Sequence, residues 1–75
     1  MNELEKLRVL IPHWIEHNEE HASEFRRWAE QSGEASSDIL VAAETMILIN
    51  DSLRSALEKL GGPLSTDLYH HHEHD

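Results

Sequence analysis

Residues 39–60 have the sequence ILVAAETMILINDSLRSALEKL, and the spacing of the apolar residues in it decides the fold. Apolar residues recur at alternating steps of three and four, which is the pattern of an α-helix that packs along one face. Gly61 follows and favours a left-handed helix end, and Pro63 prevents the helix from resuming. The expected packing seam consists of Ile39, Ala42, Met46, Ile49, Leu53, Ala56 and Leu60.

A second repeat of the same kind fills the first half of the chain. Asn2 and Glu5 have the spacing of a helix N-cap and its capping-box partner, so we expect a helix to begin there. The steps of three and four then continue, with a polar interruption in the middle. The expected seam of this helix consists of Leu4, Leu7, Ile11, Trp14, Asn18, His21, Phe25 and Trp28.

Pro12 lies inside this first repeat. A proline removes one backbone donor and clashes with the carbonyl four residues earlier, so we expect a kink near residues 8–11. The alternative is a separate short helix over residues 3–10, with Pro12 in the first turn of the main helix. Both alternatives leave residues 13–31 helical.

The only internal linker is residues 32–37, with the sequence SGEASS. Ser36 or Ser37 is expected to cap the second helix, and Asp38 to stabilise the positive end of its dipole. A loop this short between two long helices predicts an antiparallel hairpin.

Four further apolar residues lie off the seam of the second helix and make its first half apolar nearly all round. They need cover, and a chain of 75 residues has a marginal core. We therefore predict an all-α fold in which residues 1–62 form a two-helix hairpin that dimerises into a four-helix bundle. Residues 63–75 are expected to be a flexible, histidine-rich tail. The four off-seam residues are Leu40, Val41, Ile47 and Leu48.

The composition excludes several classes of function. The chain has no cysteine, which excludes disulfides, iron–sulfur clusters and thiolate zinc sites. A formal charge of −9 with six basic residues argues against nucleic acid and favours cations or a basic protein partner. No signal-peptide pattern and no apolar stretch long enough for a bilayer are visible, so we expect a cytoplasmic protein that does not bind membranes.

Residues 13–24 form three tetrads, HWIE, HNEE and HASE, that each begin with histidine and end with glutamate. A period of four places the histidines one turn apart on a helix, as a ladder with carboxylates beside it. Imidazoles and carboxylates at this spacing can bind a borderline metal ion. If Trp14 is at the centre of the buried face, the ladder runs from solvent at His13 into the core at His21. The candidate ligands are His13, His17, His21, Glu16, Glu20 and Glu24.

His21 also has a structural interpretation, as a core histidine bonded to Asn18 or Asn50. If paired residue numbers sum to about 68, these two asparagines face one another and form a polar layer that sets the register. A His-x-x-x-His spacing arises often by chance, so the ladder alone does not decide between the two interpretations.

The sequence does not indicate an enzyme. A di-iron bundle needs inward Glu-x-x-His motifs, whereas the order here is His-x-x-Glu. The second helix offers only Glu44 and Asp51, both expected on the side away from the seam. No nucleophile–base pair or phosphate-binding loop is present either.

The chain ends in a second histidine cluster, HHHEHD. Such a segment is a flexible chelator for nickel, zinc, copper or cobalt. A purification tag is the alternative, but the interrupting glutamate and final aspartate favour a native tail. We expect the tail to fold back and complete a metal site with His13 and His17. Its candidate ligands are His70, His71, His72 and His74.

Three stretches carry a family resemblance: LRVLIPHWIEHNEEH over residues 7–21, FRRW over residues 25–28 and LEKLGG over residues 57–62. Together they resemble a small uncharacterised helical-hairpin domain of anaerobic bacteria and archaea, associated with nickel-binding accessory proteins of carbon monoxide dehydrogenase. The resemblance covers residues 4–62. It implies that the three ladder histidines bind nickel or another divalent ion, and that the protein has a metalloenzyme-maturation partner. It implies no reaction.

The leading hypothesis is therefore a dimeric, non-enzymatic protein that binds a divalent transition metal, nickel or zinc, for handling, storage or delivery. The alternative is a structural or protein-interaction module whose histidines serve packing and solubility. A third hypothesis is a pH-responsive assembly in which the histidines gain charge and alter a helix interface.

Overall fold

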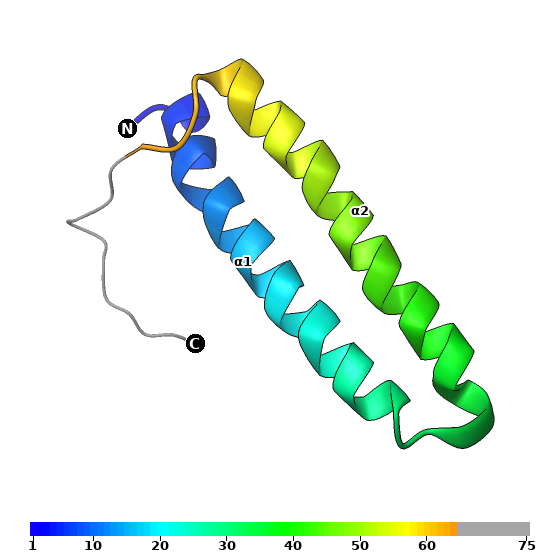
Figure 1. Ribbon diagram of the computed structural model, residues 1–75. Helices are drawn as coiled ribbons and strands as arrows, with labels where there is room; N and C mark the ends of the chain where they lie inside the picture. The colour runs from blue at the N-terminus through cyan, green and yellow to red at the C-terminus, as the bar shows by residue number, and fades with distance from the viewer. Residues whose placement is uncertain (65–75) are drawn as a thin grey trace.

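The computed structural model describes residues 1–64, which form two long helices and a short turn. Helix α1 spans Glu3–Ala29, the 3-10 helix η1 spans Gly33–Ala35 and helix α2 spans Ser36–Leu60. The two long helices lie side by side and run in opposite directions (Figure 1). The prediction of an all-α, two-helix hairpin is thus confirmed for the described residues. The histidines of the expected tail lie outside them.

The outer ends of both helices are closed as the sequence predicts. Glu5 donates its backbone N–H to Asn2 Oδ1 at 2.8 Å, and Asn2 donates its own to Glu5 Oε1 at 3.1 Å, which completes a capping box. At the end of α2, Gly61 has a φ of 110°. The N–H groups of Gly61 and Gly62 donate to the carbonyls of Glu58 and Leu57. This is the bond pattern of a Schellman motif, and it requires a left-handed residue at position 61.

The start of α2 differs from the prediction. The residue before the helix is Ala35, which makes no side-chain cap, and Ser36 already has helical backbone angles. A capping serine needs extended backbone angles. Because η1 continues directly into α2, both Ala35 and Ser36 have helical angles and no extended residue precedes the helix. The serine cap was therefore wrong, whereas Asp38 lies in the first turn as expected.

Helix α1 continues through Pro12 without a break. The alternative of two separate helices is therefore not observed, and the kink stays a prediction. Pro12 has no N–H to donate to the carbonyl of Arg8, four residues earlier. That carbonyl instead accepts a long hydrogen bond, 3.4 Å, from the N–H of Leu64. The proline thus leaves free an acceptor that the returning chain uses.

From Ile11 onwards, the line of buried residues in α1 differs from the expected seam at every second position; before it, Leu7 is half-buried as predicted, whereas Leu4 is 59% exposed. Ile11, Asn18 and Phe25 lie in it as predicted, because each is buried or half-buried. At the other positions the structure buries the next residue along the chain. The buried residues are Ile15, Ala22 and Ala29, and the exposed ones that were predicted in their place are Trp14, His21 and Trp28.

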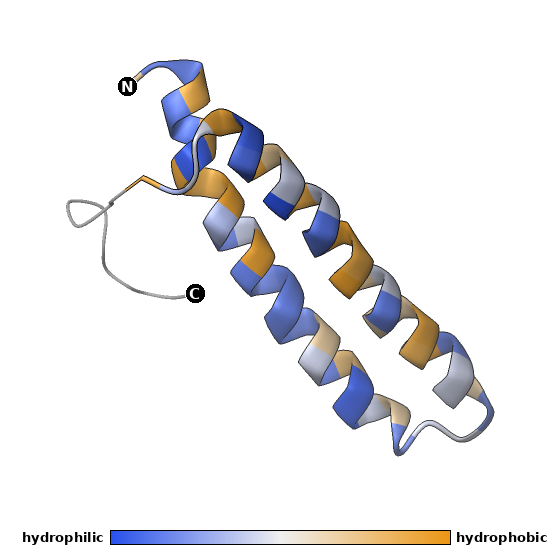
Figure 2. Ribbon diagram, turned by 45° about the horizontal axis from the view of Figure 1, so that its top comes forward, coloured by the Kyte–Doolittle hydropathy of each residue, from blue (hydrophilic) through white to orange (hydrophobic). Residues whose placement is uncertain are grey.

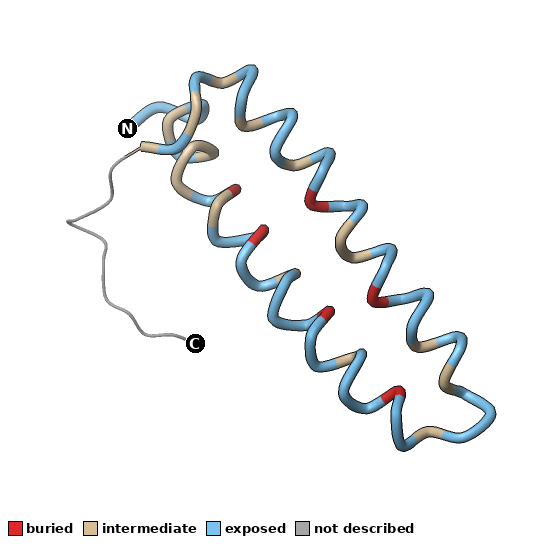
Figure 3. The backbone as a smooth tube through the Cα atoms, viewed as in Figure 1, coloured by how far each residue is buried: buried red, intermediate tan, exposed pale blue. Residues whose placement is uncertain are grey.

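Helix α2 shows the same displacement at alternate positions of its expected seam. The seam residues between those positions are half-buried as predicted: Ile39, Met46, Leu53 and Leu60. Ala43, Asn50 and Leu57 lie inside or partly inside, whereas Ala42, Ile49 and Ala56 are exposed. Figure 3 shows the buried residues of both helices on the sides that face each other. Hydrophobic and hydrophilic residues alternate along the two helices, as expected for packing on one face (Figure 2).

A pair of asparagines forms a polar layer halfway along the hairpin. Asn18 donates from Nδ2 to Asn50 Oδ1 at 2.9 Å, and Asn50 donates from Nδ2 to the carbonyl of Ile15 at 3.1 Å. The side chain of Asn50 is fully buried and both its oxygen and its nitrogen have partners. The predicted pairing of Asn18 with Asn50 is confirmed. At the same level, Arg54 and Glu19 form an ion pair of 2.7 Å on one edge.

Candidate metal-binding site

The three ladder histidines all lie on the exposed surface of α1. Each is about 6 Å along the helix axis from the next, which is four residues of helix rise. The prediction that the ladder enters the core at His21 is wrong, because the close approach of α2 buries the smaller Ala22 instead. The His21 ring stacks on Phe25, with ring centroids 6.2 Å apart and planes inclined by 28°.

The interpretation of His21 as a core histidine is also wrong. Asn18 and Asn50 satisfy each other and the carbonyl of Ile15, so neither needs an imidazole partner. Within residues 1–64, no hydrogen bond joins the side chain of any ladder histidine to another residue. The imidazole nitrogens of His13, His17 and His21 are therefore accessible to a ligand from solvent.

The ladder glutamates are exposed as well. Glu24 lies 3.8 Å from Arg27, an ion pair between two exposed side chains that has little energetic weight. Among the described residues no group of three or more histidine or carboxylate side chains is placed to hold one metal ion. The arrangement of Glu16, Glu20 and Glu24 beside the histidines thus offers pairs of ligands one turn apart rather than a complete coordination shell.

The exit of the chain from α2 is held beside the first third of α1. Arg8 donates from Nε to the carbonyl of Gly62 at 2.6 Å and from a terminal nitrogen to that of Gly61 at 2.9 Å. A Cβ atom at position 61 would lie 3.3 Å from Arg8 Cζ, so the glycine suits this approach as well as the backbone angle. The guanidinium also lies at the negative end of the α2 dipole. Together with the Leu64–Arg8 bond, these contacts fix residue 64 near α1.

This tether matters for the tail histidines, although His70, His71, His72 and His74 lie outside the described residues. Arg8 precedes His13 by five residues, or about 7.5 Å of helix rise. The six residues from Leu64 to His70 can span at most about 20 Å. The distance along the chain thus permits the tail imidazoles to reach the outer end of the ladder.

Sequence reasoning missed the role of Arg8 and Pro12. The signal was present: a proline inside a helix leaves one carbonyl without its usual donor, and that carbonyl belongs to Arg8. Nothing in the sequence, however, indicated which residue would supply the replacement donor, because Leu64 is distant in the chain.

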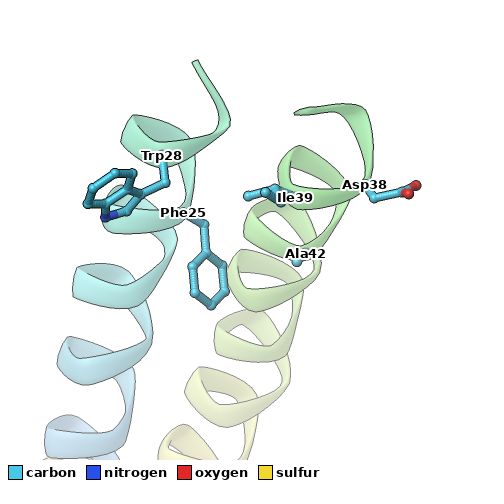
Figure 4. A pocket seen from close by; sticks show the side chains of 5 residues that line it. All are labelled: Phe25, Trp28, Asp38, Ile39 and Ala42. Atoms are coloured by element: carbon cyan, nitrogen blue, oxygen red, sulfur yellow. The ribbon is translucent and has the colours of Figure 1, made fainter. Parts of the chain in front are cut away.

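A shallow apolar groove lies near the loop end and is lined by side chains of both helices. Phe25 and Ile39 point into the space between α1 and α2, and the Asp38 carboxylate points away from it (Figure 4). Arg27 lies over the Trp28 ring at 5.7 Å from the centroid. The groove offers no ligand set for a metal, and its other lining residues are Trp28 and Ala42.

The carboxylates of α2 do not complete a metal site either. Glu44 and Asp51 are both exposed, as expected from their positions away from the seam, and Asp51 lies 3.8 Å from Arg54. None of the described helices is long and apolar enough to cross a membrane.

A family model described as a domain of unknown function (DUF8180) matches residues 7–60. No curated protein and no solved structure matches the chain. The matched range contains both helices from Leu7 onwards and the whole histidine ladder.

Proposed function

The chain belongs to the DUF8180 domain family of unknown function, and we propose that it is a non-enzymatic protein that binds a divalent transition metal ion. Nickel or zinc is the proposed ion, and handling, storage or delivery is the proposed role. The observation that carries the proposal is the exposure of His13 and His17 one turn apart on a continuous helix, with imidazoles free of protein hydrogen bonds within residues 1–64.

The chemistry of the donors supports a transition metal. With no cysteine in the chain, the available ligands are imidazole nitrogens and carboxylate oxygens. Two imidazoles at i and i+4 can bind one ion together, as they do in helical zinc sites. A helix holds the pair in place before the metal arrives, so less conformational entropy is lost on binding. Copper and cobalt suit the same donors.

Two imidazoles leave coordination positions that other ligands must fill. Glu16, Glu20 or water can take some of them, and the tail histidines can take others because residue 64 is tethered beside α1. His21 is a further candidate, together with Glu24. A location in the cytoplasm and a metalloenzyme-maturation partner complete the proposal, and both rest on the sequence arguments above.

Calorimetric titration of the full chain with zinc and nickel tests this proposal. The first variant replaces His70, His71, His72 and His74 by alanine, so that only the ladder remains. We expect it still to bind one equivalent of metal, more weakly than the parent chain. Adding His13→Ala and His17→Ala should then abolish binding. The matched control adds Ser23→Ala and Ser52→Ala instead, two exposed changes within the helices that remove no ligand.

Loss of all binding in the first variant would contradict a ladder site that binds metal without the tail histidines. Unchanged binding after removal of His13 and His17 would contradict it as well. Circular dichroism of each variant separates lost ligands from lost helix.

The second candidate function is a structural or protein-interaction module. It is favoured by the large apolar side chains that the hairpin leaves exposed, among them Trp14, Trp28 and Leu48, which are 44%, 55% and 64% exposed. In this case the histidines serve solubility, and the titration above would show metal binding by the tail alone.

A further inference from the structure

One broad side of the hairpin carries two lines of exposed residues that match each other. Each line lies one residue before a buried or half-buried position: Trp14 before Ile15 in α1, for example, and Ile49 before Asn50 in α2. We call these residues the open face; its members are Trp14, His21, Trp28, Ala42, Ile49 and Ala56.

Both lines lie on the same side of the helix pair. A step back by one residue turns the side chain by about 100° around either helix, and in antiparallel helices this step leads to the same broad side. The groove near the loop agrees, because Trp28 of α1 and Ala42 of α2 line it together. A step forward leads to the opposite side, where Glu19 and Arg54 form their ion pair.

The open face is apolar although the chain is strongly acidic. Trp14, Trp28 and Ile49 are 44%, 55% and 44% exposed. Among the exposed residues of α1 and α2 that directly precede a buried or half-buried one, only Glu24 and Asp38 are acidic, whereas the chain as a whole has 15 acidic residues and a formal charge of −9. An exposed, largely apolar surface with few acidic groups is typical of an interaction site, and this one lets a second, equally acidic copy approach.

We propose that a second copy of this chain covers the open face and completes a four-helix bundle. In such a bundle each helix packs on its neighbour in the hairpin with one side and on the other hairpin with the adjacent side. The buried residues of the two helices account for the first contact, and the open face accounts for the second. The residues that recur at steps of three and four in the sequence are alternately members of the open face and buried or half-buried residues, as expected if both sides are covered in a bundle.

The size of the face fits this occupant. Each helix is about 40 Å long and about 10 Å in diameter, so one broad side of the helix pair has an area of roughly 800 Å². Stable protein interfaces bury about 800 Å² per partner. The proposal also revises the expected reason for dimerisation: Val41 and Leu48 lie around α2 on the side away from α1, and the second copy does not need them.

Sedimentation equilibrium of the full chain in the presence of a chelator tests the proposal independently of metal binding. The parent chain should have twice the monomer mass at micromolar concentration. Ile49→Asp introduces an unpaired charge on the open face and should weaken the dimer by at least about tenfold. Leu48→Asp is the matched control: it changes the neighbouring residue, which is more exposed and points away from α1, and should leave the dimer intact.

Ala42→Glu provides a second disruptive variant in case Ile49→Asp reduces helicity. Glutamate has a higher helix propensity than aspartate, so Ala42→Glu places a charge on the open face with less loss of helix. Tryptophan fluorescence gives an independent readout, since both tryptophans of the chain lie on the open face. Their emission should shift to longer wavelength on dilution, together with dissociation.

A monomeric parent chain would overturn the proposal. So would a dimer that Leu48→Asp dissociates and both Ile49→Asp and Ala42→Glu leave intact, because the outer side of α2 would then be the interface.

Discussion

The half of the hairpin near the loop and the half near the chain ends are packed with residues of different size. The Asn18–Asn50 pair divides them. Near the loop the buried seam consists of Ala22, Ala29 and Ala43, none more than 2% exposed. Towards the chain ends the buried residues are larger, Ile11 at 3% and Ile15 at 9%.

This difference shows that burial in a two-helix structure follows size as well as hydrophobicity. Alanine lets two helix backbones approach closely, whereas an indole ring does not fit between them. Trp28 is therefore more exposed than its neighbour Ala29. The half near the loop thus gains close contact but leaves its largest apolar side chain, Trp28, outside, where a second chain can cover it.

The largest expected effect lies in the half near the chain ends. Ile11→Ala removes a large side chain that is 3% exposed and leaves a cavity, which should lower the free energy of unfolding by about 2–5 kcal/mol. Urea denaturation at fixed protein concentration measures this. Val41→Ala is the control, because Val41 is 57% exposed on the outer side of α2, and it should cost less than about 1 kcal/mol. Equal losses would show that the buried seam is not the main source of stability.

The half near the loop should respond to the opposite change. Ala43→Leu adds volume at a position that is 0% exposed, and it should force the helices apart at a cost of about 1–3 kcal/mol. The neighbouring change Glu44→Leu adds a similar apolar group on the surface and should stay within about 0.5 kcal/mol. If Ala43→Leu stabilised the protein in the same denaturation experiment, close packing of the helices at this level would be contradicted.

Much of this fold follows from local rules in the sequence. The capping box at Asn2, the left-handed Gly61 and the facing pair Asn18–Asn50 are each specified by residues whose chemistry has few alternatives. The displaced seam could not be predicted in the same way. Trp14 and Ile15 both suit an apolar face, and the choice between them depends on how closely the other helix approaches.

The candidate site was predicted less well for the same reason. Because Ala22 rather than His21 faces α2, His21 lies on the surface and not in the expected core. The ladder itself needs only the helical period of four, so the one-turn spacing of His13, His17 and His21 was predictable. Its completion by further ligands depends on the tail, which lies outside the described residues.

The smallest expected effect concerns the hydrogen bonds between Arg8 and the residues that follow α2. Arg8→Ala removes two hydrogen bonds to the carbonyls of Gly61 and Gly62, at a partly exposed site. The loss in unfolding free energy should be about 0.5–1.5 kcal/mol. Arg26→Ala, an exposed change near the loop, should cost less than about 0.5 kcal/mol. Equal effects of the two changes would mean that the hydrogen bonds of Arg8 add nothing to stability.

Pro12→Ala tests the backbone hydrogen bond from Leu64 to the Arg8 carbonyl separately from the hydrogen bonds of the Arg8 side chain. An alanine at position 12 supplies the N–H that the Arg8 carbonyl lacks, so it competes with the long bond from Leu64. We expect α1 to become more stable, because alanine suits a helix interior better than proline. Amide hydrogen exchange at Leu64 should nevertheless become faster. Slower or unchanged exchange there would show that the proline does not serve to free this carbonyl for the returning chain.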